Sequence, residues 1–129
     1  MRSGDTLLIP APGAGGTPHL WIIATEPDDD HLCIIVNFTT LRNSQDQTVS
    51  IMPSEHPFVT RPTSIRYSDA RIADVRKLRA DASTGLALPR ERCSATLLKL
   101  IQDGLRASPY TPNKVIEFYE AYRKRISGS

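Results

Sequence analysis

The side chains best suited to chemistry concentrate in one stretch, SEHPFVTRPTSIRYSDAR, at residues 54–71. Its candidate groups are Glu55, His56, Arg61, Arg66, Asp69 and Arg71. Metal-free cleavage of RNA needs a base for the 2′-hydroxyl proton, an acid for the leaving oxygen, and cations for the charge on the phosphate. Histidine titrates near neutrality and suits either proton transfer, whereas arginine binds phosphate through a planar pair of donors. The stretch therefore contains a sufficient set for this reaction.

The same residues also have an ordinary structural interpretation. His56 lies in a loop bounded by prolines, where a histidine can cap a turn or face solvent. Arg66 and Arg71 alternate with apolar residues, as on a strand that buries one face and exposes the other. Asp69 would then pair with Arg71 or hold a bulge. Both interpretations remain open from the residues alone.

Short strands separated by turns are expected over the first part of the chain. The expected strands are residues 6–9, 19–25, 31–39, 47–52 and 63–75, the last as one strand or as two joined by a bulge near Ser68 and Asp69. EPDDD separates two strands rich in β-branched residues and predicts a hairpin with an acidic turn. PAPGAGGTP, at residues 10–18, has too many helix and strand breakers for a regular element and predicts a loop.

Two helices are expected near the C-terminus. In SATLLKLIQDGLRA, residues 94–107, apolar positions three and four apart predict an amphipathic helix with Ser94 as its N-cap. A second helix follows SPYTP, with Thr111 as the cap and Pro112 as its first residue. The expected fold class is α+β, a small SH3-like antiparallel β-barrel with C-terminal helices. Residues 1–129 are expected to form one domain, with the barrel at 4–79 and the helices at 94–126 packed on it.

Composition narrows the cellular setting and the cofactors. No apolar run approaches the roughly 20 residues that cross a bilayer, and no signal-peptide pattern opens the chain, so we expect a cytoplasmic protein without membrane contact. Cys33 and Cys93 have no second thiol at metal-ligand spacing and are expected to be buried. Neither a metal nor another cofactor is expected, because no phosphate-loop or metal-ligand motif occurs.

The charge is unevenly distributed along the chain. Residues 1–60 carry two basic and seven acidic side chains, a net charge of −5, whereas residues 61–129 carry fourteen basic and seven acidic ones, a net charge of +7. A basic half can attract a polyanion such as nucleic acid, although solvated helix faces produce the same count.

The order of these elements resembles the PemK/MazF/Kid family of toxins over residues 4–79. The likeness is carried by Gly4-Asp5 before the first strand, Thr17-Pro18 entering the second, VNFTT ending the third, and IRYSDARIADV in a later strand. The resemblance implies an SH3-like barrel that cleaves single-stranded RNA without a metal. It also implies a homodimer and an antitoxin protein that holds the enzyme inactive.

Family roles transfer to this sequence only in part. Thr17 stands where the family usually has an arginine for the scissile phosphate, and Asp69 matches the family acid only after a shift of one residue, since strict spacing gives Ser68. His19 could replace the missing arginine. The expected catalytic residues are His56, Arg66, Asp69 and Thr39, and the expected substrate-binding residues are Thr17, His19, Thr40, Arg61 and Arg71. The alternative hypothesis is a catalytically inactive module on the same fold that binds a protein partner.

Overall fold

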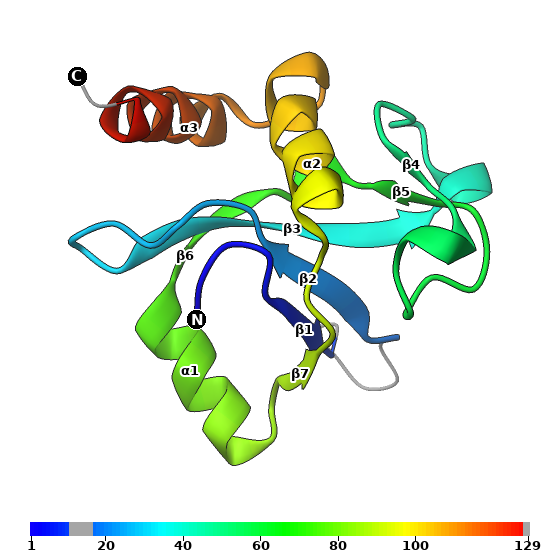
Figure 1. Ribbon diagram of the computed structural model, residues 1–129, viewed down its shortest axis with the longest axis horizontal. Helices are drawn as coiled ribbons and strands as arrows, with labels where there is room; N and C mark the ends of the chain where they lie inside the picture. Colours follow the sequence, from blue (N-terminus) through cyan, green and yellow to red (C-terminus); the bar gives the residue numbers. More distant parts are fainter. Residues whose placement is uncertain (11–16, 128–129) are drawn as a thin grey trace.

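Strands and helices are combined in an α+β fold in the computed structural model, which describes residues 1–10 and 17–127 (Figure 1). The strands are β1 (Thr6–Ile9), β2 (His19–Ile23), β3 (Leu32–Thr40), β4 (Ser50–Ile51), β5 (Thr63–Ile65), β6 (Arg71–Asp74) and β7 (Leu88–Arg90). The α-helices are α1 (Val75–Thr84), α2 (Ala95–Ala107) and α3 (Asn113–Ile126). The predicted α+β class is thus confirmed, whereas most of the loop predicted at residues 10–18 lies outside the described residues.

The sheet is antiparallel and centred on the long strand β3. The strand order is β4-β5-β3-β2-β1-β7, and β6 pairs with β3 off this path. On the side away from β2, residues 32–35 of β3 pair with β6 and residues 38–40 pair with β5. The strands at the two ends of the path, β4 and β7, do not pair with each other, so the described strands form an open sheet rather than the expected closed barrel.

The β2–β3 hairpin is confirmed, with Trp21 opposite Asn37. Its acidic turn is organised by Asp28, whose Oδ1 accepts hydrogen bonds from the backbone N–H groups of Asp30 and Leu32, each at 2.9 Å. An aspartate side chain that accepts backbone N–H groups two and four residues on stabilises a tight turn. The turn therefore has a structural role.

Both faces of the sheet are buried, because apolar residues occupy successive positions of β2 and β3. Leu20 and Ile22 point into a core cluster that also contains Leu97 and Ile101 of α2 and residues of α3. Trp21 and Ile23 point into a second cluster with Leu78 of α1. Helices α2 and α3 therefore lie on one side of the sheet and α1 on the other (Figure 1).

The strand expected over residues 63–75 is divided. β5 ends at Ile65, a 3₁₀ turn covers Tyr67–Asp69, β6 follows, and Val75 already begins α1. Tyr67 is buried and its hydroxyl donates to the Ile101 carbonyl at 2.7 Å, so this turn anchors the strand to α2. The expected strand at 47–52 contracts to β4, and the sequence analysis missed both α1 and β7.

The two C-terminal helices are present as predicted. The Ser94 hydroxyl accepts from the Leu97 backbone N–H at 3.1 Å, which confirms it as the N-cap of α2. The prediction for α3 was wrong by one residue: Pro112 is the N-cap because its ψ of 143° is not helical, and Thr111 precedes the cap. A proline still suits this position, since no N–H is required there.

Candidate functional site

A groove of about 460 Å³ lies where β2 begins and β3 ends. We call it the arginine groove. It is lined by Thr17, Pro18, His19, Leu20, Phe38, Thr39, Thr40, Phe58, Val59, Thr60, Arg61, Thr63 and Arg66. None of these residues carries a carboxylate, so the fixed charge at its wall comes from the two guanidinium groups. Such a surface attracts anions.

Antiparallel pairing explains why distant parts of the sequence meet in this groove. The β2–β3 hairpin brings the start of β2 beside the end of β3, and Nδ1 of His19 lies 3.4 Å from the carbonyl oxygen of Phe38. β5 then pairs with the same end of β3, with Thr40 opposite Thr63. Six of the nine predicted site residues line the groove: Thr17, His19, Thr39, Thr40, Arg61 and Arg66.

The groove offers donors that suit a phosphate. Arg61 and Arg66 are exposed, and neither forms an ion pair with any residue in the described part of the chain. Guanidinium groups without a carboxylate partner are available for charge-assisted hydrogen bonds to phosphate oxygens. Threonine hydroxyls along the same wall can add neutral hydrogen bonds.

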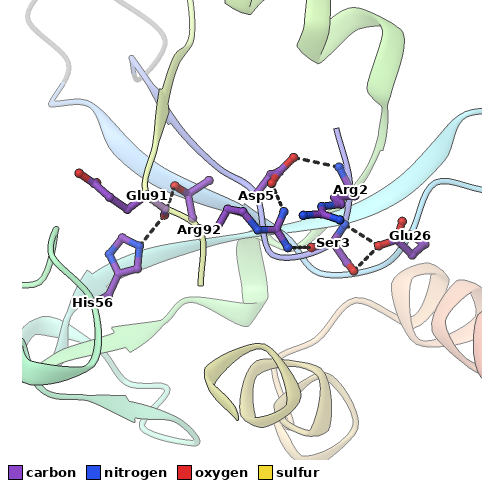
Figure 2. Close-up of polar contacts among 8 residues, drawn as sticks. Arg2, Ser3, Asp5, Glu26, His56, Glu91 and Arg92 are labelled. Carbon is purple, nitrogen blue, oxygen red and sulfur yellow. Dashed lines mark hydrogen bonds and ion pairs between the residues drawn. The ribbon is translucent and has the colours of Figure 1, made fainter. Parts of the chain in front are cut away.

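His56 lies outside this groove, in a closed environment. Its side chain is buried, at 3% exposure. Nε2 donates a hydrogen bond to the Glu91 carbonyl at 2.7 Å (Figure 2), and Nδ1 accepts one from the Phe58 backbone N–H at 3.1 Å. One nitrogen donating and the other accepting identifies the neutral ring. With both nitrogens engaged, His56 has the geometry of a structural histidine and has none free for proton transfer.

A network of polar contacts continues from His56 toward the N-terminus (Figure 2). The Glu91 carbonyl also accepts from the Thr6 hydroxyl at 2.8 Å, so it joins β1 to the loop that carries His56. Arg92 forms an ion pair with Asp5 and donates to the Ser3 carbonyl at 3.1 Å. We call the His56, Glu91 and Thr6 contacts the histidine clamp. The clamp holds the segment after β7 against two other parts of the fold.

The remaining predicted residues, Asp69 and Arg71, line a second hollow of about 420 Å³, which we call the tryptophan hollow. Its lining residues are Ile9, Pro10, His19, Trp21, Ile35, Asn37, Asp69, Arg71, Ala73 and Leu78. The Arg71 guanidinium lies over the Trp21 ring, with Cζ 4.5 Å from its centroid. Because His19 lines both spaces, the arginine groove and the tryptophan hollow adjoin.

Sequence reasoning missed Trp21 and Asn37. Trp21 resembles an ordinary core residue in HLWII, since apolar strand residues usually pack inside. Asn37 offered a usable signal: it is a polar residue within the apolar strand LCIIVNFTT. A buried amide must find partners for its oxygen and its nitrogen, so its position in a core strand indicates a special environment.

The described residues contain neither a metal-binding cluster nor a reactive cysteine. Among residues 1–10 and 17–127, no group of three or more His, Cys, Asp and Glu side chains could hold a metal ion. The two cysteines are buried, as predicted, and burial raises the pKa of Cys33 to about 12 and that of Cys93 to about 11. Neither thiol is a nucleophile at neutral pH, because the reactive form is the thiolate.

None of the described helices is long and apolar enough to cross a membrane.

Comparisons with known proteins found no match among protein-family models, curated proteins or solved structures. The geometry and chemistry of the arginine groove and the tryptophan hollow are therefore the evidence that bears on function.

Proposed function

We propose that the protein is a metal-independent endoribonuclease of the toxin-antitoxin type that binds single-stranded RNA in the arginine groove. The supporting observation is the groove itself. It combines two exposed arginines, one histidine and several threonine hydroxyls, and no carboxylate lines it. This combination suits a phosphodiester, which needs cationic donors along its backbone.

His19 takes the proton-transfer role in this proposal, because His56 is buried and both of its ring nitrogens are hydrogen-bonded. A proton on Nδ1, directed at the Phe38 carbonyl 3.4 Å away, leaves the lone pair of Nε2 available. Nε2 accepts the 2′-hydroxyl proton while the 2′-oxygen attacks phosphorus and the bond from phosphorus to the 5′-oxygen breaks. The imidazolium returns the proton to the leaving 5′-oxygen, and a 2′,3′-cyclic phosphate remains. Arg61 and Arg66 stabilise the charge on the phosphate oxygens in the transition state.

The positive charge that is missing at Thr17 is supplied by another residue in this arrangement. Thr17 lies at the position of the usual family arginine and brings no charge, yet Arg61 reaches the same groove from the loop before β5. A cation for the phosphate is thus supplied by a different segment. An SH3-like fold of the PemK/MazF/Kid type, a homodimer and an antitoxin partner belong to the same proposal. An acidic antitoxin segment would compete with RNA for the two guanidinium groups.

The test is cleavage of a long single-stranded RNA by purified protein in EDTA. We expect wild-type protein to produce 2′,3′-cyclic phosphate ends. His19→Ala should lower the cleavage rate by about 10²- to 10⁴-fold, the usual contribution of a general acid-base group. Arg61→Ala and Arg66→Ala should weaken RNA binding and cleavage. Arg79→Ala, which removes an exposed arginine from α1 on the other side of the sheet, is the matched control and should retain activity.

Intact RNA in the presence of folded wild-type protein would contradict the proposal. A cleavage rate unchanged by His19→Ala would contradict the assigned mechanism.

The second candidate function, a catalytically inactive module that binds a protein, is favoured by a different surface. Leu86 and Leu88, at and beside the edge strand β7, are 61% and 48% exposed. An edge strand with exposed leucines can receive a strand from a partner, although Pro89 removes one backbone donor from it. This function would be supported if the wild-type protein captured one stoichiometric partner, if Leu88→Asp abolished that binding, and if Arg61→Ala retained it.

A further inference from the structure

The tryptophan hollow has the composition of a small-ligand site. Its walls are mainly apolar, formed by Ile9, Pro10, Trp21, Ile35, Ala73 and Leu78, and four polar side chains converge on it: His19, Asn37, Asp69 and Arg71. Ligand pockets typically combine an apolar wall with a few placed polar groups that orient the ligand. A volume of about 420 Å³ accommodates one heterocyclic base.

Two hydrogen-bond acceptors in this hollow lack a donor. Asn37 is 3% exposed and its Nδ2 donates to Oδ2 of Asp69 at 3.3 Å, but its buried Oδ1 has no partner among the described residues. Oδ1 of Asp69 likewise has no donor in the described part of the chain, whereas Oδ2 is held by Asn37. Asp69 Oδ1 is therefore the acceptor open to a ligand that supplies N–H groups, whereas burial keeps Asn37 Oδ1 from direct contact with such a ligand.

Arg71 provides the complementary cation and a stacking surface. Its guanidinium lies over the Trp21 ring, and its Nε is 3.4 Å from the Asp69 backbone carbonyl, which ties the arginine to the acid's own residue. Arginine stacked on an aromatic ring forms a layer on which a flat heterocycle can rest. The hollow thus offers a carboxylate beside a cation and a stacked layer.

We propose that the tryptophan hollow recognises a guanine base. Guanine has two adjacent N–H donors, N1–H and the N2 amino group, which match the carboxylate of Asp69. Its purine ring would rest on the Arg71 guanidinium, which itself lies over Trp21. Adenine and cytosine present a lone pair next to their amino group on this edge, and uracil has a single N–H between two carbonyls, so each would place an acceptor against the carboxylate. This inference rests on the proposed function, since the guanine would belong to RNA whose backbone lies in the adjoining groove.

The sole tryptophan of the chain makes the test direct, because Trp21 itself lines the hollow. Tryptophan fluorescence of full-length protein is titrated with GMP, AMP, CMP, UMP and inorganic phosphate. We expect GMP to bind at least about tenfold more tightly than the other nucleotides, in line with one bidentate contact. Asp69→Asn should weaken GMP binding by a similar factor. Asp103→Asn, an exposed aspartate on α2, is the matched control and should not change it.

Thermal unfolding of each variant shows whether the protein is folded, and GMP protection of Trp21 from acrylamide quenching gives a second readout of binding. Equal affinity for all four nucleotides, a response to inorganic phosphate equal to that for GMP, or an unchanged GMP affinity in folded Asp69→Asn would overturn the proposal.

The proposal for guanine and the proposed ribonuclease function fail in distinguishable ways. RNA cleavage in EDTA without any preference for GMP overturns the guanine hollow and leaves the nuclease standing. Selective, Asp69-dependent binding of GMP by a protein that leaves RNA intact supports the guanine hollow and removes the nuclease. Cleavage enriched beside guanine, with the preference reduced by Asp69→Asn, supports both.

Discussion

Two histidines contact the same phenylalanine in opposite ways. The ring of Phe38 points into the core and meets the ring of His56 edge to face, with centroids 6.0 Å apart. The carbonyl of Phe38 lies 3.4 Å from Nδ1 of His19. His56 is buried with both nitrogens engaged, whereas His19 is half-buried and no described residue bonds to its Nε2. The difference shows that a reactive residue type is catalytically useful only where the fold leaves one of its atoms open.

The largest expected effects come from replacing the two histidines: His19→Ala should affect RNA cleavage, and His56→Ala should affect stability. His19→Ala should abolish most RNA cleavage and change the free energy of unfolding by no more than about 0.5 kcal/mol, because it lines an open groove. His56→Ala should lower the free energy of unfolding by about 3 kcal/mol, since it leaves a buried N–H of Phe58 without its acceptor and opens a cavity. Urea unfolding and cleavage in EDTA, measured on both variants, check this. Equal destabilisation by the two changes would refute the contrast.

The two histidines show which parts of the candidate site could be predicted from the sequence and which could not. His56 has the same neighbours in sequence whether its loop is open or closed, and its decisive partner, the Glu91 carbonyl, lies 35 residues away. No local pattern predicts such a contact. The grouping of Thr17, His19, Thr39 and Arg66 was predictable, because hairpin pairing places the ends of neighbouring strands together.

Elements with a strong apolar period were predicted well, and those without it were missed. The β2–β3 hairpin and α2 have continuous or helically spaced apolar residues. Helix α1, VRKLRADAST, buries only Val75 and Leu78 and follows directly from β6, so its residues resemble the end of a polar strand. Strand β7 has three residues and contains a proline, which is typical of an edge strand and gives little signal.

A second prediction tests how tightly α2 packs against Tyr67 in the core. Gly104 of α2 faces Tyr67, and a Cβ at this position would lie 2.0 Å from the Tyr67 hydroxyl oxygen. Gly104→Ala should therefore lower the free energy of unfolding by about 2 kcal/mol through overpacking, although alanine is the better helix former. Gly104→Ala combined with Tyr67→Phe should cost less than the sum of the two single changes, because the nearest clashing atom is gone, although Tyr67 Cζ at 2.6 Å and Val49 Cγ2 at 2.8 Å remain. Additive costs in thermal or urea unfolding would show that this contact is not the cause.

A third prediction concerns the cap of the helix that covers this core. Ser94→Ala removes the side-chain acceptor of the Leu97 N–H and should lower the free energy of unfolding by about 1 kcal/mol. Ser94→Asp should restore most of it, because aspartate also caps and favours the helix dipole. Neither variant should change RNA cleavage, since Ser94 does not line the arginine groove. A loss of RNA cleavage in folded Ser94→Ala would contradict the expectation that the cap of α2 affects stability without affecting the arginine groove.

The smallest effect is expected at Asp74, the last residue of β6 and the N-cap of α1. Its carboxylate accepts from the side chain and backbone of Arg76, and these hydrogen bonds hold the pKa of Asp74 at about 2, below the ordinary value of 3.8. A carboxyl with a depressed pKa in the folded state stabilises the protein above pH 3.8 and loses that contribution as pH falls toward 2. The hydrogen-exchange protection factors of the amides in the first turn of α1, which are corrected for the intrinsic pH dependence of exchange, should fall over this interval. Asp74→Asn, which can still cap but does not titrate, should remove this part of the pH dependence and leave the groove and hollow unchanged.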